Sequence, residues 1–139
     1  MDSFFYKDKE KRILKPTLFS DTAEELSGKI YNSGLQKKKD GKPELKLNKR
    51  TQLRKFYDEV IRLNSLANSK ANPEAWDNIL PYVNMLIAKA VYAEGRGNVT
   101  KDFTDFMKES IREIRDSKDL LVFANFFEAF MGFYRKYGA

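Results

Sequence analysis

The sequence predicts an all-α protein, a single compact bundle of about five helices in which residues 1–139 form one domain. Every long periodic segment repeats its apolar residues at spacings of three and four, the pattern of an amphipathic helix. No segment shows the strict alternation, bounded by glycine turns, that a strand would need. With 139 residues and 42% apolar content, the chain can bury a core without disulfides or a structural metal.

The first helix is predicted near Thr22–Ser33, after a flexible segment formed by residues 1–20. Asp21, followed three residues later by Glu24, is typical of a capping box. Gly34 is a suitable residue for the helix to end at.

The second helix is predicted to follow a flexible basic loop, residues 35–47, whose lysines repel one another. Asn48 is a candidate N-cap for this helix. Its apolar residues repeat at helical spacing: Leu53, Phe56, Tyr57, Val60, Leu63 and Ala67.

A proline interrupts the third helical segment. Asn72 and Pro73 are typical of an N-cap and a first helical residue, and the segment should end at Gly95. Pro81 lies inside the apolar pattern and removes one backbone hydrogen bond. We therefore expect either a kink or a short helix followed by a longer one that starts near Pro81.

Two further helices complete the predicted bundle. Thr100 and Ser117 are candidate N-caps, and the last helix should end before Gly138. The last helix carries aromatic residues on more than one face: Phe123, Phe126, Phe127, Phe130, Phe133 and Tyr134. A helix this apolar is either central in the bundle or has a face that meets another protein, and the two can coexist.

The composition excludes several kinds of catalysis. The sequence has no cysteine and no histidine, so thiol nucleophiles, Ser-His triads and the usual zinc sites are ruled out. Asp102 with Asp105, and Glu109 with Glu113, have helical spacing, but their basic neighbours favour solvated ion pairs over acid–base chemistry. The glycines of residues 92–98 do not form a P-loop, because no Lys-Ser/Thr follows them. We expect no enzyme activity, no cofactor and no metal site.

No apolar run approaches the roughly 18 residues needed to span a bilayer. Residues 1–15 alternate charges with scattered aromatics and lack a signal-peptide core. We therefore expect a cytoplasmic location and no membrane partner.

The positive charge is concentrated in one part of the chain. Residues 1–70 carry a net charge of +7 and residues 71–139 a net charge of −1. Such a segment is either a solvated loop or a patch that attracts polyanions. Arg and Lys at the start of a helix can hold phosphates without reading bases, and the planar guanidinium of Arg54 suits that role. The alternative for Arg54 is an exposed ion pair with Asp58, and both can hold.

Three segments occur in a characteristic order along this chain: "TQLRKFYDEV" (Thr51–Val60), "LPYVNMLIAKAVYAEGR" (Leu80–Arg96), and "FTDFMKESI" (Phe103–Ile111) followed by "VFANFFEAFMGFYRKYG" (Val122–Gly138). In this order they resemble the small-subunit family of type III-A CRISPR effector complexes, the Csm type. The resemblance covers roughly residues 47–138 and leaves out the lysine run.

The resemblance implies a non-catalytic subunit, present in several copies, that helps an antiviral effector complex hold its guide RNA and target RNA. The implied protein partners are further copies of the chain, the backbone subunits and a large polymerase-like subunit. Arg54, Lys55 and Arg96, together with Lys89 and Arg135, match basic positions of the family pattern.

The predicted RNA contacts combine these positions with the charge pattern, and they are sequence-independent contacts to phosphates. The residues are Lys49, Arg50, Arg54, Lys55, Lys89, Arg96 and Arg135. Glu128 resembles a family acid that we assign to structure or subunit contact. The alternative function is a helical protein-interaction module with no direct RNA contact.

Overall fold

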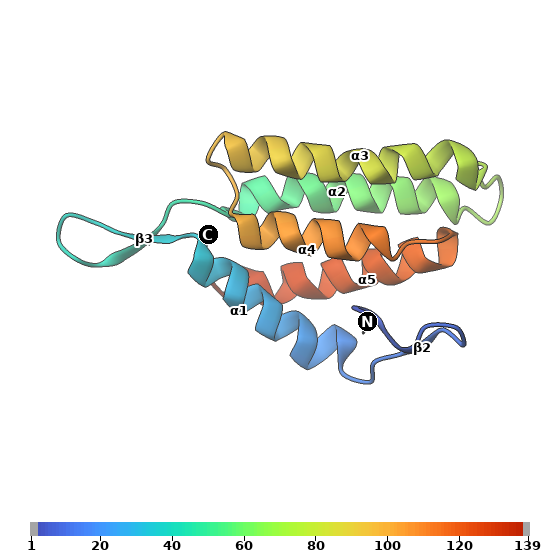
Figure 1. The fold of residues 1–139 in the computed structure, drawn as a ribbon, viewed down its shortest axis with the longest axis horizontal. Helices are drawn as coiled ribbons and strands as arrows, with labels where there is room; N and C mark the ends of the chain where they lie inside the picture. Colours follow the sequence, from blue (N-terminus) through green and yellow to red (C-terminus); the bar gives the residue numbers. More distant parts are fainter. Residues whose placement is uncertain (1–2, 138–139) are drawn as a thin grey trace.

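Five α-helices make up most of the structure, a computed structural model that describes residues 3–137. They form a closed ring in which α1 packs on α5, α5 on α2, α2 on α3, α3 on α4, and α4 on α1 (Figure 1). Their bounds are α1 (Ala23–Ser33), α2 (Arg50–Ala67), α3 (Trp76–Gly95), α4 (Lys101–Arg112) and α5 (Ser117–Tyr134). The prediction of an all-α bundle of about five helices is confirmed.

Four short strands and two short helical turns accompany the bundle. The strands pair as two antiparallel hairpins, β1 (Tyr6–Asp8) with β2 (Ile13–Leu14) and β3 (Leu35–Lys37) with β4 (Pro43–Leu45). A π-helical turn, η1 (Leu18–Thr22), precedes α1, and a 3₁₀ turn, η2 (Arg135–Tyr137), follows α5. The expectation that no segment forms strands was wrong, because strands of two or three residues are too short to show an alternating pattern.

Two predicted helix starts differ from the structure because the residues expected to cap these helices belong to other turns. Asp21 lies inside η1, so the predicted capping box with Glu24 does not form and no side chain caps α1. Asn72 and Pro73 lie in the connection between α2 and α3, and α3 begins only at Trp76. There the backbone N–H of Asn72 bonds the hydroxyl of Ser69 at 3.2 Å, which holds Asn72 in a turn.

The helix starts in the second half of the chain were predicted more closely. Thr100 occupies the N-cap position of α4, as expected. The N-cap of α5 is Asp116 and not Ser117, since the Asp116 carboxylate accepts hydrogen bonds from the backbone N–H groups of Lys118 and Asp119 at 3.1 and 3.3 Å. Aspartate provides the expected capping group one residue earlier.

Pro81 does not divide the third helical segment. α3 runs without a break from Trp76 to Gly95, so the alternative of two helices was wrong. The carbonyl that loses its usual donor belongs to Asp77, in the exposed first turn of α3, where water can replace the missing bond.

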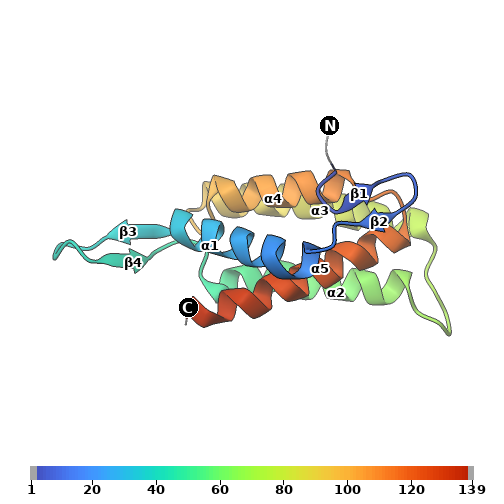
Figure 2. The same ribbon diagram turned by 90° about the horizontal axis from the view of Figure 1, so that it is seen from below.

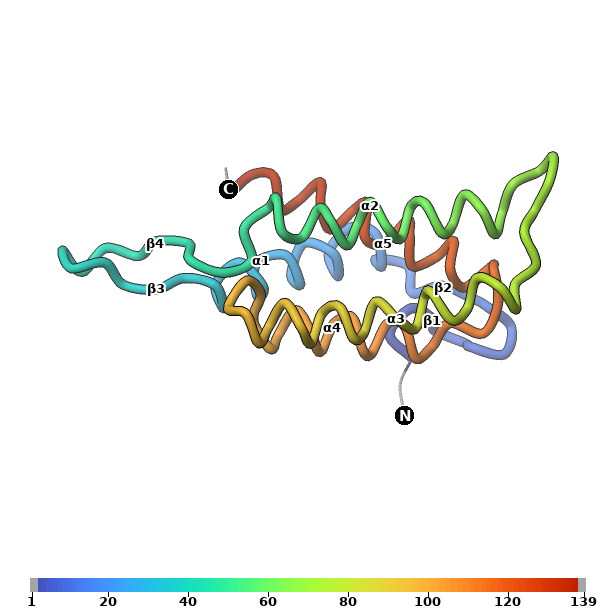
Figure 3. The backbone as a smooth tube through the Cα atoms, turned by 90° about the horizontal axis from the view of Figure 1, so that it is seen from above, coloured from blue at the N-terminus to red at the C-terminus, as the bar shows by residue number. Residues whose placement is uncertain are grey.

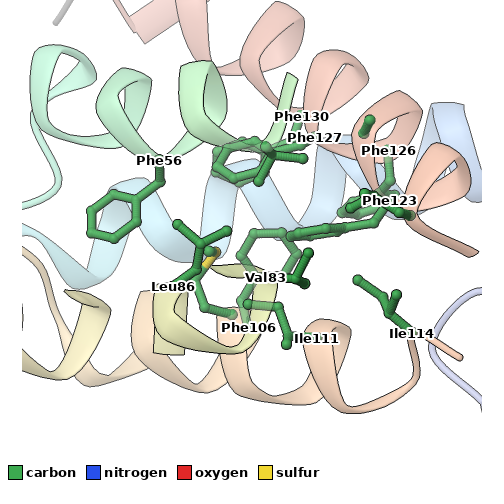
Figure 4. Close-up of a cluster of buried hydrophobic side chains, with 14 of the residues drawn as sticks. Phe56, Val83, Leu86, Phe106, Ile111, Ile114, Phe123, Phe126, Phe127 and Phe130 are labelled. Carbon is green, nitrogen blue, oxygen red and sulfur yellow. The ribbon is translucent and has the colours of Figure 1, made fainter. Parts of the chain in front are cut away.

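The core is rich in aromatic side chains, and α5 contributes more of its buried apolar residues than any other helix. Side chains from α2, α3, α4 and α5 point toward one another in Figure 4. Phe106 of α4 and Phe127 of α5 meet edge to face with ring centroids 5.6 Å apart, an arrangement worth about 0.5–1.5 kcal/mol beyond burial. Leu121 is the large apolar residue of α5 that stays exposed, so the structure supports the interpretation that the apolar residues of α5 serve the core of the bundle.

The segment before α1 is packed onto the bundle. Phe5, Tyr6 and Leu18 are buried in the core. Their burial argues against the flexibility expected for residues 1–20. Residues 1–2 of that segment, and Gly138 as the end of the last helix, lie outside the described residues.

Ion pairs attach this segment to the start of α5. Arg12 donates hydrogen bonds to both carboxylate oxygens of Asp116, at 2.9 and 2.5 Å, and the Tyr6 hydroxyl donates to buried Asp119. Arg115 also donates to Asp119, at 2.8 Å. Burial and the hydrogen bond to Asp119 raise the pKa of Tyr6 to about 12. We call Tyr6, Arg12, Arg115, Asp116 and Asp119 the N-terminal clamp.

Candidate nucleic-acid interface

The seven predicted cationic residues lie toward one end of the bundle. α2 begins there, whereas α3 and α5 end there (Figure 1). Antiparallel packing therefore brings together side chains that are far apart in sequence: Lys49, Arg50, Arg54, Lys55, Lys89, Arg96 and Arg135. The connection between α2 and α3 lies at the opposite end (Figure 3). We call the cationic end the basic end.

Three of the cations line a groove between α2 and α3. Lys55 comes from α2, Lys89 from α3, and Arg96 directly follows α3. The groove has a volume of about 720 Å³. The remaining lining residues are Gln52, Phe56, Glu59, Leu86, Tyr92, Ala93 and Asn98, among which Phe56, Leu86 and Ala93 are buried. This α2–α3 groove therefore combines an apolar floor with a mainly positive rim.

Three other cations line a smaller groove between α2 and α5. Arg50 and Arg54 come from α2, and Arg135 comes from η2 at the end of α5. The volume of this α2–α5 groove is about 190 Å³, and its other lining residues are Tyr57, Met131 and Gly132. Its charged rim consists of arginines, whose planar guanidinium groups match phosphate geometry.

The structure thus separates Arg54 and Lys55, which the sequence presents as neighbours. Successive residues of an α-helix point about 100° apart, whereas residues four apart share a face. Arg54 therefore lies with Arg50 in the α2–α5 groove, and Lys55 lies in the α2–α3 groove. Lys49 is the exposed N-cap of α2 and lines neither groove. The predicted site is two cationic surfaces on either side of α2.

Most of these cations are not held in ion pairs with acids. Arg54 lies 3.9 Å from Asp58, and both side chains are 63% exposed, so this pair is worth a few tenths of a kcal/mol. Arg96 donates to the Tyr92 hydroxyl at 3.1 Å and lies over its ring. Within residues 3–137 no carboxylate approaches within 4.0 Å of the other five. Their charge is available to an external anion.

The first turn of α2 has an unfavourable electrostatic arrangement when no anion is bound. The N-terminus of a helix carries about half a positive charge. Lys49 and Arg50 add cations there, the first turn contains no acidic residue, and no side chain caps it. An anion at this position would satisfy both the free N–H groups and the two side chains.

Asn48, predicted as the N-cap of α2, has a different role. The N-cap is Lys49, and Asn48 is fully buried with a left-handed φ of 58°. Its side-chain amide donates to the Ile30 carbonyl and the Thr100 hydroxyl, each at 2.9 Å, and its side-chain oxygen accepts from the Thr100 N–H at 2.9 Å.

The backbone of Asn48 positions both grooves. Its N–H donates to the carbonyl of Asn98, just after α3, at 3.0 Å. Its carbonyl accepts from the hydroxyl of Tyr134, the last residue of α5, at 2.6 Å. Sequence reasoning missed this role, although asparagine is among the non-glycine residues that most often adopt a left-handed conformation.

The lysine-rich segment 35–47 extends the basic end. It contains the hairpin of β3 and β4, which projects beyond the bundle in Figures 1 and 2. The expectation of a loop without regular structure was wrong in this respect, and its flexibility stays a prediction. We call residues 35–46 the basic arm.

A comparison with protein families identifies the chain. The family model described as Csm2 Type III-A matches residues 18–139. The chain belongs to the Csm2 family. A Csm2 protein is a small subunit of a type III-A CRISPR effector complex, so the resemblance read from the sequence is confirmed. A search of curated proteins and a search of solved structures gave no significant match.

The Csm2 match is wider than the resemblance in the sequence, which began near residue 47. It includes α1, the basic arm and all five helices of the ring. The hairpin of β1 and β2, with Arg12 of the N-terminal clamp, precedes it.

Among residues 3–137, no group of three or more Asp or Glu side chains is arranged to hold a metal ion. None of the described helices combines the length and the apolar character that crossing a membrane requires.

Proposed function

We propose that this Csm2-family chain is a non-catalytic assembly subunit that binds RNA through phosphate contacts at its basic end. The observation that carries the proposal is the convergence of cations from α2, from α3 and the residue after it, and from η2 on two grooves that flank one helix. Lys and Arg side chains that contact phosphates bind RNA of any sequence. Guide RNA and target RNA are the proposed ligands.

The two grooves give the proposal a geometry. The α2–α3 groove and the α2–α5 groove lie on different sides of α2, with Lys49 and Arg50 at the helix start. An RNA strand that crosses the start of α2 would meet the free N–H groups of the first turn of α2 and the cations on the rims of both grooves. The affinity would come from several weak contacts, and in an assembly from several copies of the chain.

An exposed apolar face on α3 supports the proposed protein contacts. Tyr82 and Met85 lie three residues apart on one face of α3 and are 54% and 47% exposed, which is unusual for neighbouring large apolar side chains on a monomer. We assign this face to contacts with other subunits: further copies of the chain, the backbone subunits or the large polymerase-like subunit. The same face favours the second candidate function, a protein-interaction module with no direct RNA contact.

The test removes three charges at a time. One variant carries Lys55→Ala, Lys89→Ala and Arg96→Ala, and a second carries Arg50→Ala, Arg54→Ala and Arg135→Ala. The matched control removes three exposed cations from the opposite end: Lys70, Arg112 and Lys118. Affinity for poly-U and for random RNA is measured by filter binding between 50 and 200 mM salt, for the free chain and for the reconstituted complex.

Each groove variant should bind both RNAs more weakly and by a similar factor. For single strands each lost phosphate contact flattens the slope of log K against log salt by about 0.7, so three contacts remove about two units. The control should keep the wild-type slope. Wild-type slopes in both groove variants, with normal recovery of protein partners in a pull-down, would refute RNA binding at these grooves and favour the interaction module.

A further inference from the structure

Specific backbone contacts anchor the basic arm to the bundle. Gly34 precedes the arm, and its carbonyl accepts hydrogen bonds from the N–H groups of Lys46 and Leu47 at 2.9 and 3.2 Å. A Cβ atom added to Gly34 would lie 2.3 Å from the carbonyl oxygen of Leu47, so only glycine allows this close approach of the two chain segments. The base is also continuous with buried Asn48, which is bonded to α1 and α4. The arm therefore has a fixed origin on the bundle.

The tip of the basic arm has a defined turn. The N–H of Gly41 donates to the Lys38 carbonyl at 2.9 Å, and the N–H of Lys38 donates to the Lys42 carbonyl at 2.8 Å. Gly41 has φ of 81°, and the Asp40 carboxylate accepts from the N–H of Lys42 at 2.9 Å. This is the arrangement of a hairpin with a short loop and a glycine bulge. The lysines are thus carried on a ribbon with a specific shape.

The side chains of the basic arm favour an anionic partner. Lys37, Lys38, Lys39 and Lys42 are exposed, and within residues 3–137 none lies within 4.0 Å of a carboxylate oxygen. Lys46 pairs with Glu44 at 3.1 Å.

The arm offers little apolar surface for docking on a protein. Leu35 and Leu45 face each other across the hairpin at its base, where both are half-buried. Toward the tip, beyond the Lys37–Pro43 pair, the residues are lysines, an aspartate and a glycine. Without apolar area to bury, the tip can gain affinity mainly from charge.

We propose that the basic arm is a separate phosphate-binding element that contacts the RNA backbone beyond the two grooves. At about 3.3 Å per residue, the five steps from Leu35 to Asp40 extend up to about 17 Å from the bundle. The tip lysines therefore reach phosphates that the grooves do not contact. The choice of RNA as the ligand rests on the proposed function, but the contacts are made by different residues.

The first experiment measures the salt dependence of RNA binding by the full chain. The arm variant carries Lys37→Gln, Lys38→Gln, Lys39→Gln and Lys42→Gln, which keeps Asp40 and Gly41 and so preserves the turn. Circular dichroism and a thermal melt confirm that it folds. On a 40-nucleotide RNA, its slope of log K against log salt should be about three units flatter than the wild-type slope, since each lost contact removes about 0.7.

The second experiment identifies the partner directly. A photoreactive residue, p-benzoylphenylalanine, replaces Lys39 at the tip, and in a control it replaces exposed Lys70 in the connection between α2 and α3, at the other end of the bundle. In the reconstituted complex with bound RNA, the residue at position 39 should crosslink to RNA and the one at position 70 should not. Crosslinks from position 39 to protein alone would overturn the proposal in favour of an acidic protein surface.

The outcomes separate this proposal from the proposed function. A wild-type slope in the arm variant together with flatter slopes in the groove variants would overturn the role of the arm and leave RNA binding at the grooves. A flatter slope in the arm variant together with wild-type slopes in the groove variants would refute the grooves and retain the arm.

Discussion

Replacing Asn48 should show how much its buried side chain, which links α1, α2 and α4, contributes to the free energy of unfolding. The side-chain amide can donate two hydrogen bonds and its oxygen accepts one here, from the Thr100 N–H at 2.9 Å. At about 1 kcal/mol for each bond, Asn48→Gly should lower the free energy of unfolding by about 3 kcal/mol. Asn48→Ala should lower it by about 1 kcal/mol more, because φ of 58° is unfavourable for alanine.

Urea denaturation followed by circular dichroism at 222 nm measures these losses. With an m-value of about 2 kcal/mol/M, the unfolding midpoint should fall by about 1.5 M for Asn48→Gly and by about 2 M for Asn48→Ala. Asn84→Ala, at an exposed position in the middle of α3, serves as the control and should change the midpoint little. A loss below about 1 kcal/mol in both variants, or an alanine variant as stable as the glycine variant, would refute the reasoning.

Two other predictions concern charges at opposite ends of the bundle. Arg50→Gln should raise the free energy of unfolding by about 0.3–1 kcal/mol, because it removes a cation from the positive end of α2. It should also flatten the slope of log K against log salt for RNA binding by about 0.7. A variant that is less stable than the wild type in urea would contradict the first expectation. In the N-terminal clamp, the hydrogen bond from Arg12 lowers the pKa of Asp116 from 3.8 to about 2. A lowered pKa means that the stabilisation is present above pH 3.8 and is lost as the pH falls toward 2. Asp116→Asn keeps a capping side chain and removes only the negative charge. The thermal midpoint of this variant should therefore lie below that of the wild type at pH 6 and converge with it near pH 2. A difference that stays constant with pH would contradict the ion-pair role.

The helices and the core could be predicted from the sequence because their signals are local. The spacing of Leu53, Phe56, Val60 and Leu63 determines both that α2 is helical and which of its faces is buried, and the structure buries all four. The aromatic excess of the last helix was also visible. The choice between core and partner contact could not be made from α5 alone, since it depends on what the other helices cover.

The remaining features depend on contacts between distant residues. No local pattern indicates that Arg12 meets Asp116, or that Asn48 bonds Thr100. The hairpin of the basic arm has a turn signal in Asp40 and Gly41, but its strands are too short to show a period.

That the seven cations contact RNA stays a prediction, and the structure adds where they lie. The sequence supplied the seven cations but gave Arg54 and Lys55 as a single pair. Their separation into two grooves depends on which neighbours flank α2, and that follows from the order of the helices around the ring.

The closed ring of helices has a consequence for how the sequence of this protein can evolve. The structural groups, such as the phenylalanines of α5 and the N-terminal clamp, are internal or lie away from the basic end, whereas the cations of the basic end are mostly exposed and unpaired. Exposed charges of this kind contribute little to the free energy of folding. The number and position of the cations can therefore vary with little effect on the stability of the fold. Surface substitutions can thus change the affinity for polyanions without changing the packing of the core.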